Sequence, residues 1–177
     1  SAEADWNDAG GIGGGIYSYS DNARIKISRC QITNNYSDRI GGGIYIGGAA
    51  NFYLGDEQLP YEIINSTIAY NKANKYPTSW SNHGTGIHIY GHLDVNLKNS
   101  IIFGNWYSSE IEGYEIFLNG WEGYFYPILN SLYNDIDNSA VEIDFGQSGS
   151  IGYSNGATSN NITGNISLNP LFLNGGQ

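Results

Sequence analysis

The sequence predicts an all-β fold built from stacked repeats of short parallel strands. Two kinds of phrase recur out of phase with each other, and the asparagine-rich kind is spaced by 31 to 36 residues. The asparagine-rich phrases are Arg29–Asn35, Asn65–Asn71, Asn99–Asn105 and Asn130–Ile136. The glycine-rich phrases are Gly13–Ser18, Gly41–Ile46, Gly84–Ile89 and the weaker Gly113–Leu118. Self-similarity at a period of this size is the signature of repeat architectures.

A third kind of phrase precedes each asparagine-rich phrase, at Ile25–Ile27, Tyr61–Ile64, Val95–Lys98 and Tyr126–Leu129. All three kinds are short and alternate apolar with polar residues, which favours strands over helices. Glycine, proline and asparagine interrupt the chain too often for a long helix. Three strands per repeat, with glycine or asparagine at corners that need positive φ, describe one turn of a solenoid. We expect one domain, residues 1–177, of about four to five turns with long loops.

The alternation also predicts which side chains of successive repeats line up inside. The expected inward columns are Ile16, Ile44, Ile87 and Ile116; Ser18, Ile46, Ile89 and Leu118; Ile27, Ile63, Leu97 and Ile128; and Ile32, Ile68, Ile102 and Tyr133. Small residues form a further column, Cys30, Ser66, Ser100 and Ser131. Cys30 is therefore interpreted as a core residue and not as a reactive thiol.

Asparagines in the same corner of successive repeats lie one strand spacing apart and can hydrogen-bond as a ladder. Two ladders are predicted, one of Asn65, Asn99 and Asn130 and one of Asn35, Asn71 and Asn105.

The glycine-rich and Cys-x-Ile-x-x-Asn phrases, with the closing segment Asn165–Phe172, resemble a known family. They are similar to the right-handed parallel β-helix repeat proteins of the pectate-lyase-like superfamily, in particular to bacterial secreted and surface proteins. The resemblance extends over essentially the whole chain and implies a right-handed parallel β-helix. That fold hosts lyases, hydrolases, epimerases, adhesins and scaffolds, so the resemblance implies no single function.

The charge balance excludes several classes of partner. The 177 residues include 7 Lys and Arg against 17 Asp and Glu, which gives a formal net charge of −10. Such a chain neutralises neither nucleic acid nor an anionic membrane surface, and it has no apolar run of about 18 residues for membrane insertion. The composition, rich in Gly and Tyr and without Met, is interpreted as that of an extracellular or cell-surface protein excised from a longer product.

The same register places aromatic rings on the outward side of one sheet. Tyr17, Tyr45, His88 and Phe117 form one row, Tyr19, Tyr90 and Asn119 form a second row, and Trp80, Trp106 and Trp121 lie in loops. Sugars stack their C–H faces on such rings. We therefore predict non-catalytic, adhesin-type binding of a polysaccharide or cell-surface glycan at Tyr17, Tyr19, Tyr45, Trp80, His88, Tyr90, Trp106, Phe117 and Trp121. Two other interpretations are rings that support loops folded over the sheet, and a protein interface.

A catalytic site is not evident, and no catalytic residue is assigned. The resemblance implies that a lyase would combine calcium-binding acids with a lysine or arginine, whereas the cations here are scattered and the negative charge repels polyuronates. A glycoside hydrolase needs two carboxylates at short separation. The acidic clusters are interpreted as solvated loops, at Glu110, Glu112, Glu115 and Glu122 and at Asp135, Asp137, Glu142 and Asp144. A polysaccharide lyase or glycoside hydrolase is the less favoured alternative.

No cofactor is expected. His83, His88 and His92 would be spread along an extended segment and not gathered around a metal ion. Calcium at Asp135 and Asp137 stays open, because oxygen ligands are present there.

Four Asn-x-Ser/Thr sequons are candidate glycosylation sites, at Asn35, Asn65, Asn161 and Asn165. A structural role is the remaining alternative. The two open ends of a β-helix would allow copies to stack head to tail as a homo-oligomer, in a fibre or surface layer.

Overall fold

The part of the chain that the structure describes is all-β, as the sequence predicts. The structure is a computed structural model, and it describes residues 11–20, 24–48, 60–74, 84–107, 114–120, 127–136, 151–154 and 158–166. These residues form strands and turns without any helix, and all strand pairs are parallel. Among them no helix is long and apolar enough to cross a membrane.

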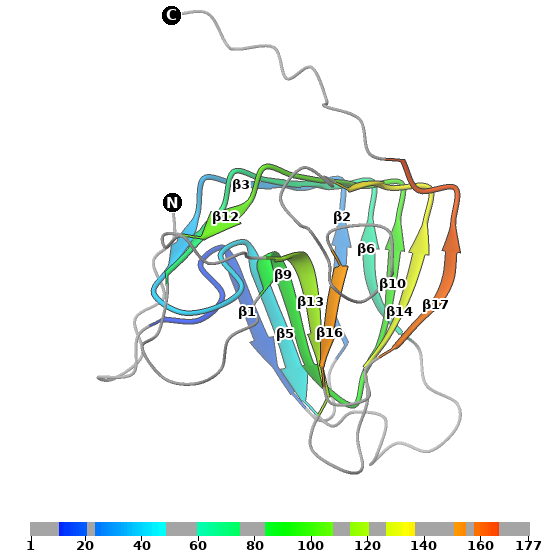
Figure 1. Cartoon of the computed structure of the whole chain (residues 1–177), viewed down its shortest axis with the longest axis horizontal. Coiled ribbons are helices and arrows are strands. Elements are labelled where there is room, and N and C mark those ends of the chain that lie inside the picture. The colour runs from blue at the N-terminus through cyan, green and yellow to red at the C-terminus, as the bar shows by residue number, and fades with distance from the viewer. Residues whose placement is uncertain are drawn as a thin grey trace, which may run out of the picture.

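The strands form four parallel sheets, and each of the first three passages of the chain adds one strand to each sheet in turn (Figure 1). Sheet 1 contains β1 (Ile16–Tyr19), β5 (Ile44–Gly48), β9 (Gly84–Gly91), β13 (Tyr114–Asn119) and β16 (Ile151–Ser154), in that order. Sheet 2 contains β2 (Lys26–Ser28), β6 (Tyr61–Ile64), β10 (Asp94–Lys98), β14 (Ile128–Leu132) and β17 (Thr158–Thr163). Sheet 3 contains β3 (Gln31–Thr33), β7 (Thr67–Ala69), β11 (Ile101–Phe103) and β15 (Asp135–Ile136). Sheet 4 contains β4 (Tyr36–Ser37), β8 (Lys72–Ala73) and β12 (Trp106–Tyr107). Within the described residues, the fourth passage adds strands to sheets 1, 2 and 3, and the fifth adds strands to sheets 1 and 2.

Sheet 4 corrects the prediction of three strands per repeat. Its strands have two residues each, which is too short for an alternation of apolar and polar residues to be visible in the sequence.

Two-residue turns join sheet 2 to sheet 3 and sheet 3 to sheet 4. The first residue of each turn has a positive φ of 50° to 62°, at Arg29, Asn65, Asn99 and Tyr133 in one series and at Asn34, Tyr70 and Gly104 in the other. The second residue of each turn, except Cys30, carries a side chain that hydrogen-bonds to the neighbouring repeat. The turns therefore fix both the direction of the chain and the register between repeats.

The predicted ladder of Asn35, Asn71 and Asn105 is confirmed. Oδ1 of Asn71 accepts hydrogen bonds from N and Nδ2 of Asn35, both at 3.0 Å. Oδ1 of Asn105 accepts from N and Nδ2 of Asn71 at 2.9 and 2.8 Å. Because Asn71 and Asn105 are buried, these bonds satisfy donors that would otherwise be costly to remove from water.

Glu115 ends this ladder, although the sequence suggested a solvated loop. Its carboxylate accepts hydrogen bonds from N and Nδ2 of Asn105, and only 1% of the residue is exposed. In the other repeats, the third position of the glycine-rich phrase is glycine. A Cβ at Gly43 would lie 2.9 Å from Nδ2 of Asn71, and one at Gly86 would lie 2.8 Å from Nδ2 of Asn105. Glu115 stands at the third position of the weaker phrase, where its carboxylate takes the place of the next ladder asparagine.

A second ladder joins the turns between sheets 2 and 3. Oγ of Ser66 accepts from N of Cys30 at 3.2 Å, and Oγ of Ser100 accepts from N of Ser66 at 3.2 Å. Oδ1 of Asn134 accepts from N of Ser100 at 2.9 Å, and Oδ1 of Asn165 accepts from N of Asn134 at 2.8 Å. Asn134 is the fourth residue of this ladder. The prediction that Ser131 continues the series of Cys30, Ser66 and Ser100 is therefore wrong.

Cys30 is exposed, which corrects its interpretation as a core residue. It lies at the end of the second ladder within the described residues, whereas Ser66 and Ser100 have neighbours on both sides. Its Sγ lies 3.3 Å from the carbonyl oxygen of Ser28, to which it donates.

The fourth repeat is shifted by three residues from the predicted register. Asn130 pairs with Asn96, and its Nδ2 donates to Oδ1 of Asn96 at 3.0 Å. Tyr133 instead takes the turn position equivalent to Asn99, with φ of 56° against 50°. The predicted ladder of Asn65, Asn99 and Asn130 is therefore wrong, and the amide of Asn65 instead donates to a backbone carbonyl of the next repeat.

The shift also replaces two residues of the predicted inward columns. Ile128 pairs with Asp94 and is half-buried, while Leu129 is 1% exposed. Ile136 pairs with Ile102 and is buried, while Tyr133 is 64% exposed.

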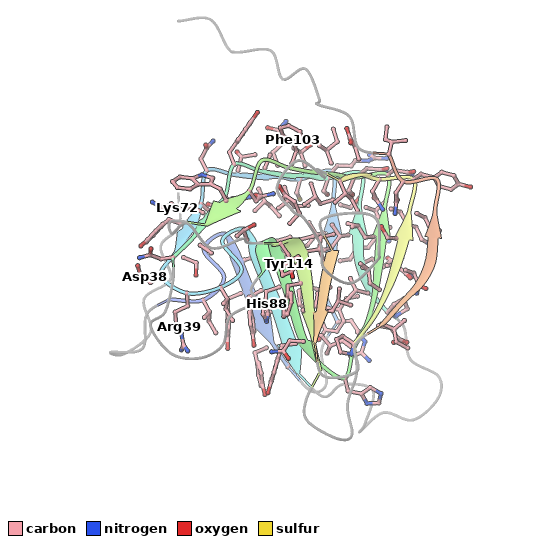
Figure 2. The ribbon with its side chains drawn as sticks, viewed as in Figure 1. Asp38, Arg39, Lys72, His88, Phe103 and Tyr114 are labelled. Carbon is pink, nitrogen blue, oxygen red and sulfur yellow. The ribbon has the colours of Figure 1, made fainter. Side chains whose placement is uncertain are left out.

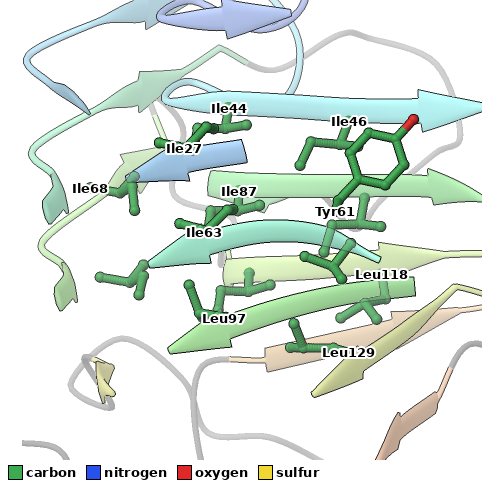
Figure 3. Close-up of a cluster of buried hydrophobic side chains, with 14 of the residues drawn as sticks. Ile27, Ile44, Ile46, Tyr61, Ile63, Ile68, Ile87, Leu97, Leu118 and Leu129 are labelled. Carbon is green, nitrogen blue, oxygen red and sulfur yellow. The ribbon is translucent and has the colours of Figure 1, made fainter. Parts of the chain in front are cut away.

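The interior is filled by the inward side chains of sheets 1, 2 and 3 (Figure 3). The columns predicted for sheet 1 are confirmed, since Ile16 pairs with Ile44, Ile44 with Ile87 and Ile87 with Ile116. Other members of the buried cluster are Ile27, Ile32, Ile46, Tyr61, Ile63, Ile68, Ile89, Val95, Leu97, Ile102, Leu118, Leu129 and Ile136.

The ladder cap at Glu115 can be tested by two substitutions. Glu115→Ala leaves N and Nδ2 of Asn105 buried without this acceptor, and each orphaned donor costs about 1–3 kcal/mol. We expect the free energy of unfolding to fall by about 2–4 kcal/mol in urea denaturation. Glu115→Gln retains an oxygen that can accept both bonds, as Oδ1 of Asn71 and Asn105 do, and should lose much less. Equal losses in the two variants would contradict the role of the carboxylate oxygens.

Candidate functional site

Long connections border sheet 1 on both sides. Strands β1, β5 and β13 are followed by connections 20–25, 49–60 and 120–127, whereas β9 is followed by residues 92–93 alone. Connections 38–43, 74–83 and 108–113 precede β5, β9 and β13. The turns between the other sheets have two residues. Because binding residues concentrate on and beside variable loops held by a rigid scaffold, the outward face of sheet 1 is the candidate site.

The predicted outward row on sheet 1 forms a continuous stack of rings. Tyr17 pairs with Tyr45, Tyr45 with His88, and His88 with Phe117. The centroid separations along this row are 5.3, 5.5 and 5.6 Å, with interplanar angles of 14°, 8° and 36°. Tyr114 adds a further ring 5.3 Å from Phe117. Figure 2 labels Tyr114 and His88, which belong to the paired strands β13 and β9. We call Tyr17, Tyr45, His88 and Phe117 the ring stack.

Most of the ring stack is buried. Tyr45 is 6% exposed, and His88 and Phe117 are 1% exposed, whereas Tyr17 is 40% exposed. Nδ1 of His88 accepts a hydrogen bond from the amide of Gly84 at 3.3 Å, which fixes its ring within the stack. Three of the four rings therefore form a rigid support beneath the surface, and the stack is open to solvent at Tyr17.

The second row opens at the same end. Tyr19 pairs with Gly47, Gly47 with Tyr90, and Tyr90 with Asn119. Tyr19 is 50% exposed and Tyr90 is half-buried, while Asn119 is buried. Tyr17, Tyr19 and Tyr90 thus form an open group of phenol rings beside buried Tyr45. We call these three residues the tyrosine platform.

Burial favours the neutral form of three phenols of this region, those of Tyr17, Tyr45 and Tyr90. Burial raises the pKa of Tyr45 above its ordinary value of 10.0, nearby Tyr17, Tyr90 and Tyr19 raise it further, and Arg39 opposes the shift weakly. Burial and Tyr19 also raise the pKa of Tyr17 and of Tyr90. At neutral pH each hydroxyl can donate and accept a hydrogen bond, which suits an uncharged hydroxylated ligand.

Trp106 lies on a different sheet from the ring stack. On sheet 4, Trp106 pairs with Lys72 and Lys72 pairs with Tyr36. Nζ of Lys72 lies 4.4 Å from the centroid of the Trp106 ring and 5.6 Å from that of Tyr36. Trp106 is 50% exposed, and the lysine between the rings makes a cation–π column. The structure therefore does not bring Trp106 into the tyrosine platform.

Two predicted members of the site, Trp80 and Trp121, lie outside the described residues. The same holds for His83, Glu110, Glu112, Glu122, Asp137, Glu142 and Asp144. Within the described residues no group of three or more His, Cys, Asp or Glu side chains is placed to hold a metal ion.

The candidate glycosylation sites differ in exposure. Asn65 is exposed, whereas Asn35 and Asn165 are half-buried. Nδ2 of Asn35 donates to Oδ1 of Asn71, and Nδ2 of Asn165 donates to Oγ of Ser131 at 2.8 Å. In the folded chain both of these amides belong to the ladders. Asn161 lies in β17, and its side chain is outside the description.

Three contributors to the aromatic surfaces were missed in the sequence. Gly47 lies between Tyr19 and Tyr90. Alignment of the glycine-rich phrases places Gly47 opposite Tyr19, so its position in the second row could have been predicted from the sequence. Lys72 beside Trp106 and Tyr114 beside Phe117 required the fold, since sheet 4 and the bulge at Tyr114 leave no periodic signal.

Comparison of the chain with protein-family models, with curated proteins and with solved structures gives no match. The site is therefore interpreted from its own geometry.

The shifted pKa of Tyr45 predicts a loss of stability at high pH. Its folded-state value is raised, so its contribution is fully present below pH 10 and is lost as pH rises through the folded-state pKa. We expect the free energy of unfolding to fall above pH 10, by up to about 1.4 kcal/mol per pH unit for each such phenol. Tyr45→Phe should show a shallower decline in denaturation curves measured from pH 8 to 12. Parallel declines in the two proteins would contradict this assignment.

Proposed function

We propose that the protein is a non-catalytic polysaccharide-binding module, extracellular or displayed at a cell surface. We further propose that its four parallel sheets are the faces of a right-handed parallel β-helix of the pectate-lyase-like kind. The uniform pairing of each strand with its equivalent one repeat away, and the constant two-residue turns, support this architecture.

One observation supports glycan binding above all. The rings of the tyrosine platform are exposed, while the neighbouring rings of Tyr45, His88 and Phe117 are buried. Tyr17 and Tyr19 are 40% and 50% exposed. Tyr17 lies against buried Tyr45, which is itself stacked on His88. A ring held as Tyr17 is loses little conformational freedom when a ligand stacks on it, which lowers the entropic cost of binding.

The charge of the site indicates the type of glycan. Burial raises the pKa of Tyr17 and of Tyr90 above 10.0, so these phenols are neutral at physiological pH, and the net charge of the whole chain is −10. A polyuronate would meet long-range repulsion, whereas a neutral sugar can stack on the rings and exchange hydrogen bonds with the hydroxyls. We therefore propose a neutral polysaccharide as the partner.

Alanine substitution of the platform tests this function. Tyr17→Ala and Tyr19→Ala each remove an exposed ring without removing the buried stack. We expect each to weaken binding to a neutral glycan on the order of tenfold, since an aromatic anchor contributes more than about 1 kcal/mol. Retention on insoluble glycans and titration with soluble oligosaccharides from a broad panel measure the effect.

Tyr133→Asn is the matched control. Tyr133 is also an exposed tyrosine, at 64%, but it lies in a turn between sheets 2 and 3. Asparagine tolerates the positive φ of that position, so folding and binding should both be retained. No binding of the wild-type protein to any glycan of the panel would refute the proposed function, as would equal losses in Tyr133→Asn and Tyr19→Ala.

A further inference from the structure

Gly47 has no conformational reason to be glycine. It lies within β5, in register with Tyr19 on one side and Tyr90 on the other, and its φ is not positive. Glycine inside a strand is unfavourable unless another group needs the space above it. The reason for glycine at position 47 must therefore be the group that occupies the space where a side chain would lie.

Two tyrosine rings occupy that space. A Cβ added to Gly47 would lie 2.8 Å from Cδ2 of Tyr19, 2.9 Å from Cε1 of Tyr45 and 3.1 Å from the Tyr45 hydroxyl oxygen. The ring of Tyr19 therefore extends from its own repeat over the backbone of Gly47 in the next repeat, and the hydroxyl end of Tyr45 lies over the same residue. The absence of one side chain therefore leaves room above Gly47 for rings from two repeats.

The two rings would respond differently to a side chain at position 47. Tyr45 is 6% exposed and is stacked between Tyr17 and His88, so it has little room to move. Tyr19 is 50% exposed and can rotate toward solvent. An added methyl group should therefore displace Tyr19 most, and the Tyr45 ring must also shift slightly to relieve the 2.9 Å approach to its Cε1.

We propose that Gly47 is a positioning residue of the glycan site, because it allows Tyr19 to lie beside Tyr45 as part of one continuous platform. This inference rests on the proposed function. Gly47 itself makes no contact with the sugar in this scheme, and it acts through the place and orientation of the Tyr19 ring. The ligand class is the same neutral polysaccharide, whose ring needs a flat support that a freely rotating tyrosine does not provide.

A double-mutant cycle between Gly47→Ala and Tyr19→Ala tests the inference. Titration with the neutral oligosaccharide that binds wild-type protein most tightly should show binding weakened on the order of tenfold by each single substitution. In the Tyr19→Ala background, Gly47→Ala should have no further effect. The thermal midpoint of Gly47→Ala should stay within about 4 °C of the wild type, which separates lost positioning from lost folding.

The geometry has its own readout in the wild-type protein. Nuclear Overhauser contacts between the ring protons of Tyr19 and the α protons of Gly47 are expected, and their absence would overturn the inference even if Gly47→Ala failed to fold. Full binding by Gly47→Ala, or a further loss when it is added to Tyr19→Ala, would also overturn it while leaving the proposed function intact. A wild-type protein that binds no glycan would refute the proposed function, and the positioning role with it.

Discussion

The side-chain ladders within the two-residue turns are the interaction on which the register of the sheets depends. In each turn the first residue reverses the chain with a positive φ, and from the second repeat onward the second residue places a side-chain oxygen against an amide of the preceding repeat. A hydrogen bond of this kind contributes only about 0.5–1.5 kcal/mol net, but an unsatisfied buried amide costs more. A slip of one residue in any strand would leave several such amides unpaired and would turn the apolar side chains outward.

The aromatic site is a consequence of this register. The ring stack forms because equivalent residues of successive repeats lie one strand spacing apart, so that Tyr17, Tyr45, His88 and Phe117 meet at 5.3 to 5.6 Å. Glu115 shows the same dependence from inside the fold. It replaces the glycine that elsewhere makes room for a ladder asparagine, and its carboxylate then ends the ladder.

The sequence was sufficient for the all-β class, the sheet 1 columns and the ladder of Asn35, Asn71 and Asn105, because each rests on a repeated pattern. The fourth repeat was misaligned because Asn130-Ser131 copies the letters of Asn99-Ser100, whereas the spacing of the earlier repeats points to Tyr133-Asn134. Hydrogen bonding decided between them, since Oδ1 of Asn134 reaches the amide of Ser100.

The burial of the site could not be predicted in the same way. Alternation tells which face of a strand a residue occupies, and it placed Tyr45, His88 and Phe117 correctly on the outward face. Whether an outward face is covered depends on the rest of the chain, which carries no period. The low exposure of these three rings therefore had no signal in the repeats.

Tyrosine over glycine is a recurrent packing arrangement in this chain, and its position decides what it can do. The ring of Tyr70 lies against Gly104 and the ring of Tyr133 against Gly164, each in the following repeat, as the ring of Tyr19 does with Gly47. Gly104 and Gly164 have positive φ, which favours glycine, although Tyr70 and Tyr133 adopt a similar φ at turns of the preceding repeats.

Gly47 differs because its backbone would accept another residue. The ring that it admits lies on a strand, among three other tyrosines on an outward face. Packing of a tyrosine ring over a glycine therefore occurs at two turns, where it joins neighbouring turns. On sheet 1 the same packing extends a flat aromatic surface from one repeat to the next.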